Sequence, residues 1–268
     1  MDPVLPGLFE ENSITRRVNR ENVLLLGGGR ALLMQLAHPK VALGVDEHSD
    51  FRKDPIRRLR RTIRMTMAIV FGDRETALSA ARTVNQVHAR VRGEDYSALD
   101  PDLLLWVHAT LADTALVTYE TFVAPLLPHE REDFYQDFKL MSVLLGIPRD
   151  RFPARLRDFE TYLAEMMSTG PVRVGPRALE LARQILRPRL RLVPSPFMVP
   201  LEIITTGLLP TTLRDQYRLA WGPSQRSAYR LAVTTLPRVI ALTPPRIRVW
   251  PLPGRTLRLT PGGRAVSS

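Results

Sequence analysis

Apolar residues recur at intervals of three and four along most of this chain, the spacing that gathers side chains on one face of an α-helix. In the first half of the chain this pattern predicts helices over residues 27–44, 55–71, 77–91 and 103–123. Further helical patterns cover residues 129–145, 154–167, 176–186, 201–209, 211–220 and 224–239. Alternation typical of strands is weak, and its best candidate is the segment 246–259. The pattern therefore predicts an all-α fold.

Residues that begin or end helices mark several of these boundaries. Pro55 suits the first turn of a helix, and Gly72 stops the same helix. Asp73 can cap the next helix, whose apolar stripe ends before Gly93. The Asp-Pro-Asp segment 100–102 combines a cap, a proline at the first position and an acid in the first turn. The helix that it starts is apolar nearly all round, so we expect it at the centre of the fold.

The chain of 268 residues contains no linker or low-complexity run that divides it, and its 44% of hydrophobic residues can form a sizeable core. We predict one compact helical domain over residues 1–245 and a loose basic tail over residues 246–268. The apolar stretches 23–45 and 190–213 are interrupted by charged residues or prolines, so neither is expected to span a membrane. The N-terminus lacks the basic and apolar regions of a secretion signal, so the expected compartment is the cytoplasm.

The net charge of +11 raises the question of an anionic partner. The 35 arginines and three lysines are spread over most predicted helices and form no single stripe, so we expect no nucleic-acid partner. The segment 245–268 carries five arginines and no acidic residue. It could make a peripheral contact with an anionic membrane, although a solvated tail is the commoner arrangement.

The composition excludes several classes of active site. The chain has no cysteine, which excludes disulfides, thiolate nucleophiles, iron–sulfur clusters and cysteine ligands to zinc or haem. It has no phosphate-binding loop, no HExxH zinc motif and no GxSxG serine motif, and the GGGR at 27–30 is not a dinucleotide fingerprint. The paired ExxH motifs of di-iron bundles are also absent. Any metal must be held by His, Asp or Glu.

Three of the five histidines, His38, His88 and His108, lie on the apolar stripes of predicted helices. A lone histidine of this kind is usually a core imidazole bound to a backbone carbonyl, but three on separate helices weaken that explanation. His38 precedes a proline and can simply turn the chain, whereas His108 has Thr110, Asp113 and Thr114 nearby as hydrogen-bond partners.

His88 has a further neighbour, because Arg92 follows it by four residues, the spacing of one helical turn. A neutral imidazole on a core face is typical of an axial haem ligand. A guanidinium one turn further along can pair with a carboxylate, such as a haem propionate.

A second cluster of polar residues lies in the segment RRLRRT at 57–62. Arg58 and Thr62 share a helix face, and Arg61 lies beside them. Composition favours a solvated basic face. If the Arg58 and Thr62 side instead turns inward, it supplies hydrogen-bond donors to an oxygen species or a carboxylate in an apolar cavity.

The segments GGGRALLMQLAHPKVALGV, RRLRRTIRMTMAIVFGD, VNQVHARVRG and DPDLLLWVHATLADTAL resemble, in order and spacing, the successive motifs of the MpaB-type oxygenases. This family includes the catalytic domain of the rubber oxygenases, or latex-clearing proteins. The resemblance covers residues 12–190 and is loose beyond them. It implies a single globin-like helical domain that binds haem b and uses dioxygen to cleave carbon–carbon double bonds in isoprenoid chains.

The resemblance also implies roles for particular residues. His88 matches the proximal iron ligand, and Arg92 matches the arginine one turn beyond it. Arg58, Arg61 and Thr62 match the distal pocket, where rubber oxygenases carry a lysine at the position of Arg61. A guanidinium cannot ligate iron or shuttle protons as lysine does. The absence of a secretion signal favours a small or membrane-dissolved hydrophobic substrate over an extracellular polymer.

We therefore expect a haem b-dependent oxidoreductase, an oxygenase that takes a hydrophobic unsaturated substrate and dioxygen. Two alternatives stay open. The first is a haem-binding or sensing protein without turnover, in which both axial positions are filled by histidines such as His88 and His108. The second is a helical adaptor whose basic tail binds a membrane or an acidic partner.

Overall fold

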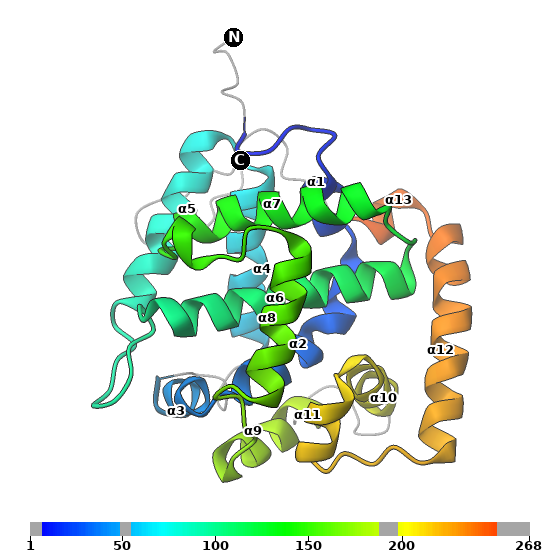
Figure 1. The fold of residues 1–268 in the computed structure, drawn as a ribbon. Helices are drawn as coiled ribbons and strands as arrows, with labels where there is room; N and C mark the ends of the chain where they lie inside the picture. The colour runs from blue at the N-terminus through cyan, green and yellow to red at the C-terminus, as the bar shows by residue number, and fades with distance from the viewer. Residues whose placement is uncertain (1–6, 49–54, 188–197, 251–268) are drawn as a thin grey trace.

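The computed structural model describes residues 7–48, 55–187 and 198–250, and over these the protein is built from helices (Figure 1). The prediction of an all-α fold is confirmed. In the described segments, extended pairing is limited to isolated bridges between Gly7 and Asp73, Glu21 and Val249, and Arg92 and Ser97.

The first half of the chain forms α1 (Ile14–Asn19), the 3-10 helix η1 (Asn22–Gly27), α2 (Gly28–Leu36), α3 (Pro39–His48), α4 (Pro55–Phe71), α5 (Arg74–His88) and α6 (Pro101–Phe122). The second half forms α7 (Pro128–Leu144), the 3-10 turn η3 (Arg149–Arg151), α8 (Leu156–Ser168), α9 (Pro176–Leu186), α10 (Val199–Leu208), α11 (Thr211–Gln216), α12 (Pro223–Leu242) and α13 (Pro245–Arg248).

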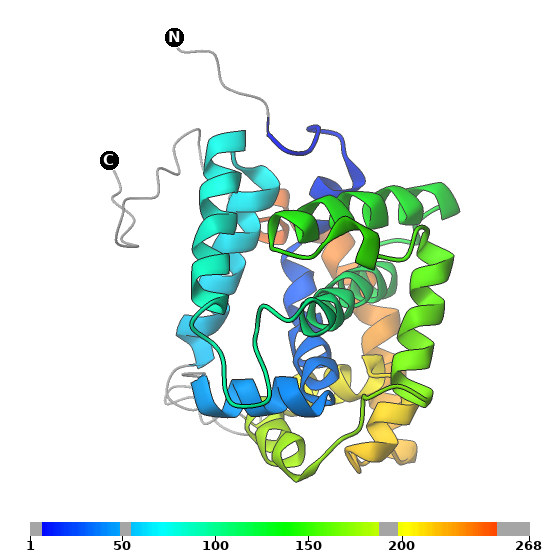
Figure 2. The same ribbon diagram turned by 60° about the vertical axis from the view of Figure 1, so that its left-hand side comes forward.

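Helix α6 is the centre of the fold, as its apolar sequence predicts. Asp100 caps it by accepting from the amides of Asp102 and Leu103, and Pro101 occupies its first turn. Its buried side chains cover every side of the helix and include Trp106 and Phe122. In Figure 2 α6 is seen nearly end-on, with α7 above it, α3 and α9 below it, and the pair α4 and α5 to one side.

The expected single helix over residues 27–44 is wrong, because the chain breaks between α2 and α3. Pro39 has no amide hydrogen and cannot follow a helical turn without crowding the preceding carbonyls. The break itself is well bonded: the Ala37 carbonyl accepts from the amide of Arg173 at 2.8 Å, and the Leu33 carbonyl accepts from the Tyr217 hydroxyl at 2.7 Å. The chain therefore turns at His38, as the proline after this residue suggests.

The predicted end of the helix over residues 77–91 is also wrong. Asp73 caps α5 as predicted, by accepting from the Thr76 amide at 2.7 Å, but the helix ends at His88. The loop that follows docks on α3, because the Tyr96 hydroxyl donates to Glu47 at 2.6 Å and the Tyr96 ring meets the His48 ring edge-on. Figure 2 shows this loop running from α5 down to α3 before it returns to α6.

The GGGR segment joins three helices at close range. A Cβ atom on Gly27 would overlap Thr118 of α6, and one on Gly29 would overlap Thr205 of α10. Arg30 is buried and donates to the Leu208 carbonyl at 2.8 Å, to Thr114 at 2.6 Å and to Asp113 at 2.6 Å. These contacts give the segment a structural role, in agreement with the absence of a dinucleotide fingerprint.

The C-terminal part departs from expectation at two places. Helix α11 ends at Gln216 and not at residue 220, because Arg218 adopts a positive φ of 54°. The segment 246–259, the best strand candidate, begins instead with the helical turn α13. Residues 251–259 lie outside the described residues, as does the rest of the predicted tail to residue 268.

The start of the predicted tail is packed against the helical body. Arg248 forms two hydrogen bonds, of 2.7 and 2.9 Å, with the carboxylate of Glu21, which is 1% exposed. The amide of Trp250 donates to the Arg20 carbonyl, and Asn22 donates to the Ile247 carbonyl. Residues 245–250 are therefore part of the folded body, and a loose tail stays a prediction for residues 251–268 alone.

Candidate functional site

His108 lies in the middle of α6 and is 3% exposed. Its ring packs edge-on against Phe138 of α7, with the ring centroids 6.1 Å apart. Burial, with a smaller contribution from the charge of His88, lowers the pKa of His108 to about 3. The imidazole is therefore neutral at neutral pH.

The hydrogen bonds around His108 fix which of its ring nitrogens carries the proton. The Ser142 hydroxyl donates its only hydrogen to the Phe138 carbonyl at 2.9 Å. It must then accept from Nδ1 of His108, which lies 2.9 Å away. Nδ1 is thus protonated, and Nε2 carries the lone pair that can accept a hydrogen bond or bind a metal.

The sequence suggested the wrong partners for His108. Thr110 donates instead to the Val107 carbonyl, while Asp113 and Thr114 bind Arg30. The actual partner, Ser142, is 34 residues away in the chain. No pattern in the sequence around His108 indicates this contact, because it depends on how α7 packs on α6.

His88 is the last residue of α5 and is half-buried. Its Nδ1 is buried and has no hydrogen-bond partner among the described residues. Burial lowers the pKa of His88, so this imidazole also favours the neutral form. Because the charge of His88 affects the pKa of His108, the two rings lie within electrostatic reach of each other. The structure thus brings together two of the three histidines that the sequence singled out.

Asn85 lies one turn before His88 on the same face of α5, and the sequence analysis missed it. Its side-chain amide nitrogen donates to the Leu144 carbonyl at the end of α7, at 3.0 Å. Its oxygen Oδ1 is buried without a partner among the described residues and lies near Gly146. Two consecutive turns of α5 therefore each present a buried polar atom that the described residues leave unbonded.

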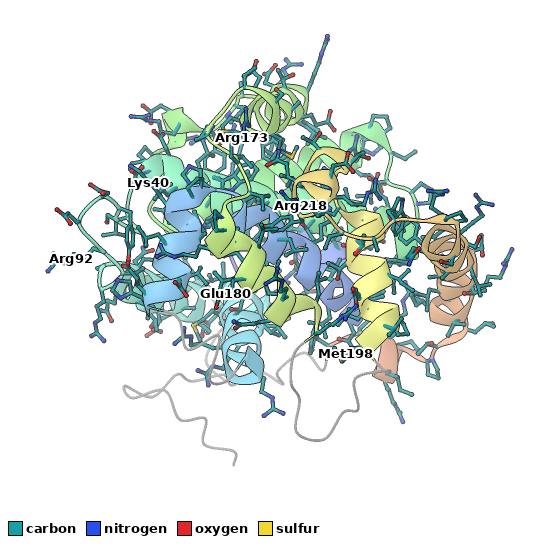
Figure 3. All side chains as sticks on the ribbon, turned by 90° about the horizontal axis from the view of Figure 1, so that it is seen from below. Lys40, Arg92, Arg173, Glu180, Met198 and Arg218 are labelled. Carbon is teal, nitrogen blue, oxygen red and sulfur yellow. The ribbon has the colours of Figure 1, made fainter. Side chains whose placement is uncertain are left out.

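Arg92 does not stand where the sequence predicts it. The helix has ended at His88, so Arg92 is not one helical turn along the same face. It lies in the loop that follows, its side chain is exposed, and Figure 3 shows it at the edge of the molecule. Its backbone carbonyl lies 3.1 Å from Nε2 of His48.

The distal candidates lie on α4. Arg61 and Thr62 are exposed. The side chain of Arg58 lies outside the described residues. Arg60 is exposed too, which favours the solvated basic face for this part of the helix. The assignment of Arg58, Arg61 and Thr62 to a distal pocket stays a prediction.

The remaining histidines differ from the pair formed by His88 and His108. His38 is buried, and its Nδ1 has no partner among the described residues. Burial and the charge of Lys40 lower the pKa of His38, whereas the charge of Asp100 raises it. His129 is exposed in the first turn of α7, and His48 is exposed as well. These two are suitable controls for substitutions at the site.

The chemistry of the donors can be tested against the implied haem. In the described segments, no group of three or more His, Asp or Glu side chains could hold a metal ion by itself. Haem iron needs only one or two protein ligands, because the porphyrin supplies four. A neutral, partly buried imidazole with an unbonded ring nitrogen fits that requirement at His88. The role of Arg92 as a propionate partner stays a prediction.

Comparison with known proteins shows which family the chain belongs to. Residues 15–238 match the family described as ER-bound oxygenase mpaB/B'/rubber oxygenase, catalytic domain. Uncharacterized proteins of Mycobacterium tuberculosis and Mycobacterium bovis are each 28% identical over 232 residues, which is 82% of this chain and 89% of the relative. No solved structure matches the chain. The resemblance inferred from residues 12–190 is confirmed, and the match continues into α12.

Proposed function

Because this chain belongs to the family of the ER-bound oxygenase mpaB and rubber oxygenase catalytic domains, we propose that it is a haem b-dependent oxygenase that acts on a hydrophobic, unsaturated, isoprenoid-like substrate. The family makes it an oxidoreductase of the oxygenase class. The observation that supports haem is the His88 imidazole, which is neutral, partly buried and unbonded at Nδ1, and lies near a second neutral imidazole.

In this proposal His88 is the proximal iron ligand. Burial keeps its proton off, so a lone pair is available at neutral pH. Asn85, one turn earlier, ties α5 to the end of α7 through the Leu144 carbonyl and so holds the helix end on which His88 stands. Haem b, when bound, supplies the activation of dioxygen.

The other residues of the site shape its surroundings. His108 is held by Ser142 with Nε2 as its lone-pair nitrogen, so it can accept a proton or a hydrogen bond there. The Phe138 ring beside it excludes water from that side. Arg58, Arg61 and Thr62 of α4 are proposed on the distal side, and Arg92 beyond His88, as in the family.

The proposed reaction needs no co-reactant other than dioxygen in its product-forming step. One carbon–carbon double bond and one molecule of dioxygen give two carbonyl groups, and both oxygen atoms are retained in the products. We also propose a cytoplasmic location and contact with a membrane surface. The membrane contact goes with a hydrophobic substrate, because an isoprenoid chain partitions into lipid.

The test is a single-turnover experiment with labelled oxygen. Haem-loaded, reduced protein is mixed with a short isoprenoid alkene under ¹⁸O₂, and the carbonyl products are analysed by mass spectrometry. The proposal expects one ¹⁸O atom in each of two carbonyl fragments. Unchanged alkene together with a normal haem spectrum would exclude the cleavage reaction, at least for isoprenoids, while leaving haem binding in place.

A second candidate function rests on the two buried histidines, because the charge of His88 contributes to the lowered pKa of His108. If both histidines bind the iron, the protein is a six-coordinate haem protein that senses or stores haem without turnover. The two candidates differ in their spectra. A reduced form that takes up dioxygen or carbon monoxide supports the oxygenase, and a six-coordinate spectrum that these gases leave unchanged supports the sensor.

A further inference from the structure

Helix α12 lies along one edge of the molecule (Figure 1). No other described helix covers its outer side. None of its residues is buried, and three of its large apolar side chains are exposed: Leu231 by 63%, Val239 by 57% and Leu242 by 84%. Ile247 of the adjoining α13 is 68% exposed. We call this surface the outer face of α12 and α13.

The inner side of α12 has ordinary packing partners. Val233, Leu236 and Ile240 pack on a cluster formed by Phe122 of α6 with Ile204 and Leu208 of α10. The contact with α10 is so close that a Cβ atom on Gly207 would overlap the Tyr229 ring. The helix is thus held firmly in place, and the exposure of its outer side chains does not come from a loose helix.

The outer face is cationic as well as apolar. Arg226, Arg230 and Arg238 of α12 and Arg246 of α13 are all exposed. The chain has no acidic residue after Asp215, and nine arginines follow that position. At 100° per residue, Arg230 and Arg238 lie beside the row formed by Leu231 and Leu242, both on the same side of it. A helix with apolar and arginine side chains mixed on its free side has the features of an interfacial helix.

The arginines and the exposed leucines together indicate which kind of partner this face binds. A second copy of this chain, related by a two-fold axis, would set the same arginines against each other, which is unfavourable. A nucleic acid would neutralise the arginines but would give the exposed leucines nothing apolar to contact. A membrane with anionic lipids satisfies both, because its headgroups pair with arginine and its acyl region accepts leucine.

We propose that the outer face of α12 and α13 is a docking surface for anionic phospholipid membranes. Helix α12 has 20 residues and is therefore about 30 Å long. It would lie in the plane of the headgroups with Leu231, Val239 and Leu242 inserted. The attachment that we propose is peripheral. No described helix is long and apolar enough to cross a bilayer. The proposal agrees with a lipid-dissolved substrate but does not depend on the proposed oxygenase activity.

The experiment is a vesicle co-sedimentation assay on the full chain, with and without haem. Vesicles of phosphatidylcholine are compared with vesicles that contain about 30% phosphatidylglycerol. The full chain is expected to bind the anionic vesicles, and raising the salt concentration should weaken binding. The double variant Leu231→Gln, Leu242→Gln should lose at least about tenfold in partition coefficient. The variant Arg230→Gln, Arg238→Gln should lose about tenfold and show a weaker salt dependence.

Matched controls use exposed residues of the same types on other faces. Leu140→Gln on α7, where Leu140 is 45% exposed, controls for a lost leucine, and Arg82→Gln on α5 controls for a lost charge. Both should bind as the unmodified chain does. If the α12 variants bind normally, or if the controls lose as much, the proposal is overturned. It is also overturned if the leucine variant dissociates a dimer seen by light scattering, or if the chain prefers duplex DNA to anionic vesicles.

Discussion

The histidines of this chain differ in what surrounds their ring nitrogens. Nδ1 of His108 donates to Ser142, whereas Nδ1 of His88 and of His38 are buried without a partner. An unbonded buried nitrogen costs free energy, because water no longer satisfies it. A ligand that binds there recovers that cost, which is why His88 is a better candidate for cofactor binding than a fully bonded histidine.

The burial of these histidines predicts how stability depends on pH. The folded-state pKa of His108 is about 3, against an ordinary value of 6.5, so the unfolded chain binds the proton more tightly. The free energy of unfolding should therefore fall as the pH is lowered from about 6.5 toward 3, by up to about 1.4 kcal/mol per pH unit for this residue. His38 and His88, whose pKa values are also lowered, act in the same direction.

Urea unfolding at several pH values between 7 and 4 measures this dependence. In the variant His108→Leu, the free energy of unfolding should depend less steeply on pH. The difference in slope should correspond to nearly one bound proton, even if the stability of the variant at pH 7 is reduced. The variant His129→Leu removes an exposed histidine and should keep the slope of the unmodified chain. Identical slopes in all three proteins would mean that His108 titrates normally in the folded state.

At the level of elements, the sequence predicted what local rules determine. Caps and prolines placed the starts of α4, α5 and α6 correctly, because these signals act within one turn. The predicted helix boundaries were wrong where tertiary contacts determine where a helix ends. The amide of Arg173 and the hydroxyl of Tyr217 stabilise the break after α2, and Tyr96 draws the chain after His88 toward α3. Such partners are far away in the chain and leave no local signal.

The glycines of the GGGR segment give an element-scale prediction. Gly27→Ala should clash with Thr118, and Gly29→Ala with Thr205, so each should lower the free energy of unfolding by about 1–3 kcal/mol. Gly28 has no atom within 4 Å of an added Cβ, so Gly28→Ala should be neutral or stabilising by up to about 1 kcal/mol. Thermal unfolding of the three variants checks this order. Equal destabilisation at all three positions would contradict the close packing of η1 and α2 on α6 and α10.

At the level of the whole molecule, the C-terminal boundary follows from one buried ion pair. Glu21 is almost fully buried and is bonded twice by Arg248. A chain that ends after Thr243 leaves this carboxylate with only Arg20, at 3.8 Å, and should lose about 3 kcal/mol. A chain that ends after Trp250 keeps the pair and should be as stable as the full chain. Chemical denaturation of the two truncated proteins decides, and equal stability would show that residues 244–250 are dispensable.

The candidate site could be predicted only in part. The sequence identified His88 and His108 from their apolar surroundings, and the resemblance to the family assigned His88 a role. It could not identify Asn85 or Ser142, because each acts through a contact between α7 and another helix. It also placed Arg92 on a helix that ends four residues earlier. The positions of Arg61 and Thr62 on an exposed part of α4 leave their proposed role to be tested with the cofactor bound.

The most direct test of the central claim is the haem content of the His88→Ala protein, measured from the Soret absorbance after expression with haem supplied. The account predicts that the unmodified chain and His129→Ala retain haem in equal amounts and that His88→Ala loses it, while all three show the same helical circular dichroism. A His88→Ala protein that is folded and carries as much haem as the unmodified chain would contradict the account.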